Sequence, residues 1–254
     1  NGANCSEAQS SPVRRRHRAP GRMAGPTYFP SVSFLLALLA MSTPLMHVRA
    51  LRGSGRATNN KTYKYFGYGS NMVVTTMTAL RRVEVLEPPV AAVLPDYQLR
   101  FDVPGAPLFE PSAASVKPFE GDHVHGVLYT LSAADFAKVG ATEGVPFGYR
   151  WSRCKVVPYI GNEDAAGREA LTRARDLAVT AFTLIATNRS PGDDIPPSKS
   201  YLELIQRGAK EFKMDESYQA KLQDVPIARN LLVPKGLAGI TLQLSELGNM
   251  RPFG

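Results

Sequence analysis

Cysteine is almost absent from this chain of 254 residues, which contains only Cys5 and Cys154. Cys5 lies in a segment that we expect to be removed, so Cys154 would have no partner for a disulfide within the domain. A lone cysteine beside Val156 and Val157 is typical of a small core or strand residue, and no histidine in a recognisable partner motif accompanies it. The sequence therefore excludes a disulfide-stabilised scaffold and disfavours thiol catalysis.

Histidine is also scarce, with four in the chain. His123 and His125 alternate along an expected strand, so both would project to one face and could ligate a metal. No third ligand stands at a suitable spacing, and Asp193-Asp194 lies in an expected loop, where solvated carboxylates are common. The sequence therefore predicts no metal site.

Acidic residues are nearly missing from residues 1–57, which hold eight arginines and a single acid, Glu7. The rest of the chain has 22 basic and 21 acidic residues, so the net charge of +8 belongs almost wholly to the N-terminal segment. A near-neutral body offers no electrostatic surface for a polyanion. Nucleic acid is therefore not an expected partner.

No apolar run reaches the roughly 20 residues that a membrane-spanning helix needs. The run Val32–Met41 follows a short segment from Met23, which fits a translation start, and precedes a helix-breaking Pro44 and a cleavage site expected after Ala50. This arrangement is typical of a signal peptide. We expect residues 1–62 to be a targeting leader with linker and residues 63–254 to be the folded domain, without a stable membrane span in the mature form. Secretion and plastid import both stay open, whereas a cytoplasmic location is disfavoured.

Several strands followed by C-terminal helices predict a single α+β domain, with a mostly antiparallel, barrel-like sheet and flanking helices. The expected strands are residues 63–68, part of 90–103, 115–118, 123–131, 149–159 and 177–186. Pro95-Asp96 is expected to interrupt the second of them, and a turn at residues 120–122 is expected to separate the third from the fourth. The expected helices are residues 72–82, 133–139 with Ser132 as N-cap, 199–212, and a further short helix capped by Asp215 or Ser217. Proline- and glycine-rich loops are expected at residues 103–113 and 191–197.

The most informative string is YFGYGSNM, residues 65–72. A strand opens here into a turn in which Gly69 permits close approach of another group, and Ser70 and Asn71 offer side-chain donors and acceptors. Successive backbone N–H groups in such a turn can hold a carboxylate or a phosphate. An ordinary strand-to-helix turn has the same composition, so these residues alone leave both interpretations open.

The string resembles the YGSN signature of the γ-glutamylcyclotransferase superfamily, also called AIG2-like. Two later segments resemble the same family in the same order, namely GDHVHGVLYTLSAADFAKVGATEGVPFGYR and AFTLIATN…IPPSKSYLELIQRGAKEF…SYQAKL. The second is similar to the C-terminal strand, loop and helix of γ-glutamylcyclotransferase itself. The resemblance covers roughly residues 63–223.

The resemblance implies a role for particular residues. Glu143 falls on the family's catalytic glutamate, and Tyr201 matches a tyrosine that lines the pocket in related enzymes. Tyr149 stands one position earlier than the family's tyrosine after the E-G-V turn. The substrate anion would be held by Tyr68, Gly69, Ser70 and Asn71.

The implied activity converts a γ-glutamyl amino acid, or a similar amide, into 5-oxoproline and a free amine. The substrate's own α-amine is the nucleophile, so no metal or other cofactor is needed. Glu143 would transfer the protons, with its pKa raised by an apolar enclosure for which Val145, Pro146 and Phe147 are suited. A γ-glutamylamine cyclotransferase and a non-catalytic small-ligand binder are alternatives. The sequence leaves a monomer and a homodimer both open.

Overall fold

The computed structural model describes residues 61–159, 166–172 and 174–229. The expected leader, residues 1–62, lies almost entirely outside the described residues and stays a prediction. The first strand begins at Thr62, one residue before the start expected for the domain.

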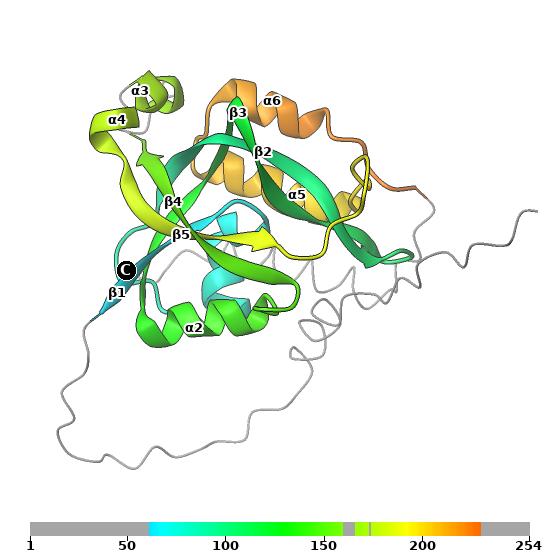
Figure 1. Ribbon diagram of the computed structural model, residues 1–254, viewed down its shortest axis with the longest axis horizontal. Coiled ribbons are helices and arrows are strands. Elements are labelled where there is room, and N and C mark those ends of the chain that lie inside the picture. Colours follow the sequence, from blue (N-terminus) through cyan, green and yellow to red (C-terminus); the bar gives the residue numbers. More distant parts are fainter. Residues whose placement is uncertain (1–60, 160–165, 173, 230–254) are drawn as a thin grey trace, which may run out of the picture.

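The described body is built on one sheet closed into a barrel (Figure 1). Around the barrel the strand order is β1-β3-β2-β4-β5, and every pairing is antiparallel except the β1–β5 closure at Tyr65 and Phe182. This confirms the predicted α+β class with a mostly antiparallel, barrel-like sheet. The strands are β1 (Thr62–Gly67), β2 (Val90–Ala106), β3 (Glu110–Ser132), β4 (Tyr149–Pro158) and β5 (Val179–Ala186).

The two longest strands correct the prediction of separate short strands and a loop. Residues 103–113 are the end of the β2–β3 hairpin, not a loop, and β3 runs unbroken through the turn expected at residues 120–122. Gly121 adopts a φ of +81° within β3, and the β2–β3 register shifts between Pro95 and Tyr97. Bulges and glycines of this kind bend barrel strands without ending them. The residues interpreted as breakers are therefore bends.

The helices begin largely where their caps predicted. Ser132 accepts a hydrogen bond from the Asp135 N–H at 3.0 Å, and Asp215 accepts one from the Ser217 N–H at 2.9 Å. None of the helices in the described ranges is long and apolar enough to cross a membrane. The helices are α2 (Ala133–Thr142), α3 (Ala166–Thr172), α4 (Ala174–Leu177), α5 (Lys199–Glu211) and α6 (Glu216–Gln223).

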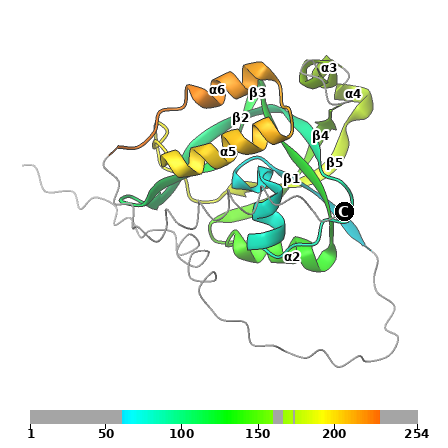
Figure 2. The same cartoon turned by 180° about the vertical axis from the view of Figure 1, so that it is seen from behind.

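The prediction of a regular helix over residues 72–82 is wrong about the type of helix. A 3-10 turn, η1 (Ser70–Met72), is followed by a π-helix, η2 (Thr76–Leu80), in which the Arg81 N–H donates to the Thr76 carbonyl at 3.1 Å. The β-branched residues of this stretch lose side-chain freedom in a regular α-helix, so their preference for the α-helix is low. Both views place this segment between α5 and α2 (Figures 1 and 2).

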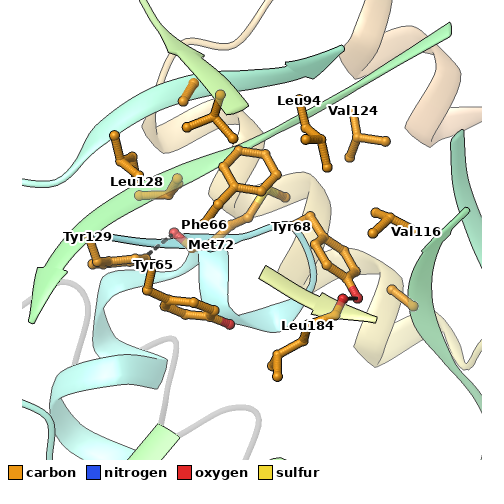
Figure 3. Close-up of a cluster of buried hydrophobic side chains, with 14 of the residues drawn as sticks. Tyr65, Phe66, Tyr68, Met72, Leu94, Val116, Val124, Leu128, Tyr129 and Leu184 are labelled. Atoms are coloured by element: carbon orange, nitrogen blue, oxygen red, sulfur yellow. Dashed lines mark hydrogen bonds between the residues drawn. The ribbon is translucent and has the colours of Figure 1, made fainter. Parts of the chain in front are cut away.

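Buried aromatic side chains fix the end of β1 inside the barrel (Figure 3). Tyr65 and Phe66 are almost fully buried, and the Tyr68 hydroxyl donates to the Leu184 carbonyl at 2.6 Å. From β3, the Tyr129 hydroxyl donates to the Asn71 carbonyl at 2.7 Å. The turn after β1 is thus held by the barrel on both sides.

Cys154 of β4 has the buried surroundings that the sequence predicted, and Trp151 of the same strand is also packed inside the domain. Cys154 is buried, its Sγ lies 3.6 Å from the Ala181 carbonyl oxygen, and burial raises the pKa of its thiol to about 12. The Trp151 ring packs edge-on against Tyr65 and is stacked on Phe136. Both side chains are therefore packing residues, and a neutral thiol is a poor nucleophile.

His125 gives the fold a predicted sensitivity to acid. Its ring is 1% exposed, stacks on Tyr218 with ring centroids 4.4 Å apart, and contacts the Tyr159 hydroxyl through Nδ1. Burial, with a smaller contribution from His123, lowers the pKa of His125 to about 3. Because the folded-state pKa lies below the unfolded value, the stabilisation is present above about pH 6.5 and is lost as the pH falls towards 3, by up to about 1.4 kcal/mol per pH unit.

Replacing His125 with phenylalanine is therefore expected to flatten the pH dependence of stability between pH 6.5 and 4. Urea unfolding of the wild type and of the variant at several pH values in this range measures the slope. His123→Phe is the matched control, because His123 is only partly buried and should change the slope less. An unchanged slope in His125→Phe contradicts the assignment.

Candidate active site

Glu143 caps the C-terminus of α2 and points towards the turn after β1. Its N–H donates to the Val139 carbonyl at 3.0 Å, and Gly144, with a φ of +70°, turns the chain away immediately afterwards. The Asn71 side chain donates through Nδ2 to Glu143 Oε1 at 2.8 Å. The fold thus brings together two of the predicted site residues that lie 72 positions apart, and leaves the Glu143 side chain only 17% exposed.

Arg81 completes this network and was not among the predicted site residues. Its guanidinium forms an ion pair with Glu143 Oε1, and its Nε donates to Asn71 Oδ1 at 2.8 Å. Its NH1 donates to Thr142 Oγ1 at 2.6 Å. No spacing or motif in the sequence distinguishes Arg81 from a surface arginine of the expected helix, because the π-turn that orients it was not predicted.

Tyr201 and Tyr149, from two different elements, bond to the two backbone polar groups of Ala114 in β3. The Tyr201 hydroxyl accepts from the Ala114 N–H at 3.1 Å, and the Tyr149 hydroxyl donates to the Ala114 carbonyl at 2.8 Å. Burial is the main cause that raises the pKa of both phenols, and the nearby charge of Glu143 adds to the shift. They are therefore neutral wall residues and hydrogen-bonding groups rather than bases.

Gly69 and Ser70 form the open part of the turn. Gly69 precedes η1, which has no side-chain cap, and the first N–H groups of a helical turn have no partner within it. A Cβ atom added to Gly69 would lie 3.1 Å from the Tyr201 hydroxyl and 3.7 Å from the Ala114 Cβ. The turn therefore faces α5 and β3 at close range.

The expected enclosure of Glu143 by its sequence neighbours is partly wrong. Pro146 is exposed and Phe147 is 84% exposed, whereas Val145 packs against the core. The buried wall comes instead from the barrel, where the Tyr65 hydroxyl accepts from Asn71 Nδ2 at 2.6 Å. Pro146 and Phe147 do not enclose Glu143, because the tight turn at Gly144 leaves both exposed.

A cavity of about 300 Å³ lies elsewhere, between the loop at Pro196-Pro197 and α6. Neither Glu143 nor the turn at Tyr68–Asn71 lines it. The candidate site is the polar network around Glu143 and Asn71. The cavity is a weaker candidate, because it does not bring a carboxylate next to the turn at Tyr68–Asn71. The described residues contain no group of three or more His, Cys, Asp or Glu side chains that could hold a metal ion.

Parts of the chain are similar to known proteins. Residues 123–222 match the AIG2-like family. The chain is 30% identical over 144 residues to γ-glutamyl cyclotransferase gliK of Claviceps purpurea, an alignment that covers 54% of this chain and 59% of that protein. It is 28% identical over 173 residues to γ-glutamylcyclotransferase of Bos taurus, covering 67% of this chain and 82% of the bovine protein.

A solved structure of a γ-glutamyl cyclotransferase has the same fold. It aligns with a TM-score of 0.55 at 22% identity, over 72% of this chain and 99% of that one. The matched segment spans less than two thirds of the fungal relative. The solved structure shows the fold, and the matches in sequence support this chain as a member of the γ-glutamylcyclotransferase-like, or AIG2-like, superfamily.

Proposed function

We propose that this protein is a γ-glutamylcyclotransferase that converts a γ-glutamyl amino acid to 5-oxoproline and the free amino acid, with Glu143 as general acid and base. The observation that carries the proposal is the mostly buried Glu143 carboxylate, hydrogen-bonded to Asn71 of the YGSN turn. The named cyclotransferase relatives support the same reaction class.

The reaction needs proton transfer more than it needs a nucleophile from the protein. A bond forms between the substrate α-nitrogen and the γ-carbonyl carbon, and the bond from that carbon to the leaving nitrogen breaks. Two protons leave the α-ammonium, which becomes the lactam N–H, and two arrive on the leaving nitrogen, which departs as an ammonium. Glu143 accepts and returns them one at a time, while the folded γ-glutamyl arm supplies proximity.

The turn at Tyr68–Asn71 has the groups to hold the substrate α-carboxylate. The Asn71 side chain is already engaged by Tyr65, Arg81 and Glu143, so its share in binding would come from its backbone N–H. Ser70 is partly exposed and can add its hydroxyl. We assign anion binding to these groups, with the neutral phenols of Tyr149 and Tyr201 as walls.

Replacing Gly69 with alanine tests the proposed place of the substrate. The added methyl group would enter the gap between the turn and Tyr201, where a contact of 3.1 Å is already tight. We expect KM to rise about tenfold, which corresponds to about 1.4 kcal/mol of lost binding, with a smaller change in kcat. Steady-state kinetics measure this, and an unchanged KM would place the substrate elsewhere.

The function is tested by assaying the purified protein for 5-oxoproline with a γ-glutamyl amino acid, glutathione and γ-glutamyl-lysine side by side. Turnover that is fastest with the γ-glutamyl amino acid supports the proposal. Preference for γ-glutamyl-lysine would instead indicate a γ-glutamylamine cyclotransferase. Saturable binding without any product would indicate a non-catalytic binder.

We also propose that residues 1–62 direct the protein to the secretory pathway or to a plastid. The support is the ordered series of Met23, the apolar run and the small residues before Ala50. A fluorescent protein fused behind residues 1–62 distinguishes the two destinations, and diffuse cytoplasmic fluorescence would refute both.

A further inference from the structure

The two oxygens of the Glu143 carboxylate have different surroundings. Oε1 accepts from Asn71 Nδ2 at 2.8 Å and also takes the Arg81 ion pair. Among the described residues, nothing donates a hydrogen bond to Oε2. One oxygen is thus held by two donors, and the other is left for a group that the described residues do not supply.

Every nitrogen of the Arg81 guanidinium takes part in this arrangement. Its three nitrogens contact three different residues, Asn71, Thr142 and Glu143. Thr142 and Glu143 lie at the end of α2, whereas Asn71 lies in the turn after β1. Arg81 therefore joins the element that carries the acid to the element proposed to hold the substrate.

The π-helix η2 explains how the backbone presents this arginine. Its wide turn closes with the hydrogen bond from the Arg81 N–H to the Thr76 carbonyl, and the next residue, Arg82, has a φ of +52° and an exposed side chain. The side chain of Arg81 is consequently only 14% exposed and lies in the network, whereas that of Arg82 lies at the surface. Single π-turns are frequent at functional sites.

We propose that Arg81 is a positioning residue that fixes Glu143 through Oε1 and so reserves Oε2 for proton transfer to and from the substrate. This rests on the proposed function. The terminal torsion of a glutamate is broad, so an unheld carboxylate would sample many orientations. A lysine has no rigid fork of donors and cannot make the three contacts together.

Arg81→Ala is expected to lower kcat about 100-fold, the loss typical of a misplaced catalytic group, with a smaller effect on KM. Added guanidinium chloride at millimolar concentration should restore activity saturably, because the site is partly open to solvent. Urea, which has the same planar shape but no charge, should not restore it. Arg81→Lys should recover little, and Arg82→Ala is the matched control that should keep wild-type kinetics.

Two kinetic results would overturn the inference. One is an Arg81→Ala variant within about threefold of the wild-type kcat, since a positioning loss is far larger. The other is rescue by urea equal to rescue by guanidinium, which would show that Arg81 only fills space. If the wild type forms no 5-oxoproline, the proposed function is refuted, but the inference about Arg81 is not. The inference is then tested by a measurement that does not depend on enzymatic activity.

That test comes from thermal unfolding of Arg81→Ala, Glu143→Ala and the double variant, because alanine, unlike glutamine, removes the acceptor of the Arg81 contact. If Arg81 holds Glu143, the decreases in Tm of the two single variants are not additive. The double variant then melts close to the Tm of the less stable single variant. Shifts that add up fully would show that the two side chains are not coupled, and would overturn the inference whether or not the wild type is active.

Discussion

Glu143→Gln is expected to reduce 5-oxoproline formation about a thousandfold, within the range that a general acid–base group contributes. Glutamine has nearly the same shape and keeps an oxygen that can accept from Asn71 and Arg81, but it cannot accept the α-ammonium proton. The product is quantified by mass spectrometry at saturating substrate, so that kcat and not binding is compared. The circular dichroism spectrum should be unchanged, because only the charge of one interaction is lost.

Glu84→Gln is the matched control for this variant. Glu84 is exposed and lies outside the network around Asn71, so its substitution should leave the rate within about twofold of wild type. Retained turnover in Glu143→Gln would remove Glu143 from the chemistry. Loss of turnover in both variants would point to a general effect of charge rather than to a proton-transfer group.

Gly208→Ala is expected to cost both stability and activity, although alanine is the better helix former. In a helix interior this change normally stabilises by up to about 1 kcal/mol. Here the new Cβ would lie 2.6 Å from the Met72 Cβ and 3.1 Å from the Met72 backbone carbon, so α5 or the turn must move. We expect a net loss of about 2 kcal/mol and a fall in Tm of roughly 4–8 °C.

The activity loss in Gly208→Ala follows from the position of Met72, which directly follows Asn71. A shift of the turn changes the contact between Asn71 and Glu143, and a misplacement of about 1 Å can cost about a hundredfold in rate. Lys210→Ala on the exposed side of α5 is the control and should change neither property. A Gly208→Ala variant that is more stable than wild type contradicts the close packing of α5 on η1.

Local signals in the sequence predicted much of the fold. The caps at Ser132 and Asp215 are side-chain interactions between near neighbours, so they could be identified without tertiary information. The bounds of β4 and α5 agree with their predicted ranges to within one residue. The YGSN turn and Glu143 were identified as site residues through the family resemblance.

Features that depend on closure of the barrel were not predictable in this way. Gly121 and Pro95 are breakers in a flat strand but bends in a coiled one, so β2 and β3 were divided. The orientation of Arg81 depends on a π-turn, for which the sequence has no specific pattern. Phe147 was expected to shield Glu143 because it is adjacent in sequence, yet the turn at Gly144 leaves it exposed.

The most direct test of the account is to identify the product that the purified full-length protein forms from a γ-glutamyl amino acid. Mass spectrometry in water enriched in ¹⁸O distinguishes cyclisation from hydrolysis. The account predicts unlabelled 5-oxoproline and the free amino acid in equal amounts, because the attacking nitrogen belongs to the substrate. Labelled glutamate, or no release of the amino acid at all, would contradict it.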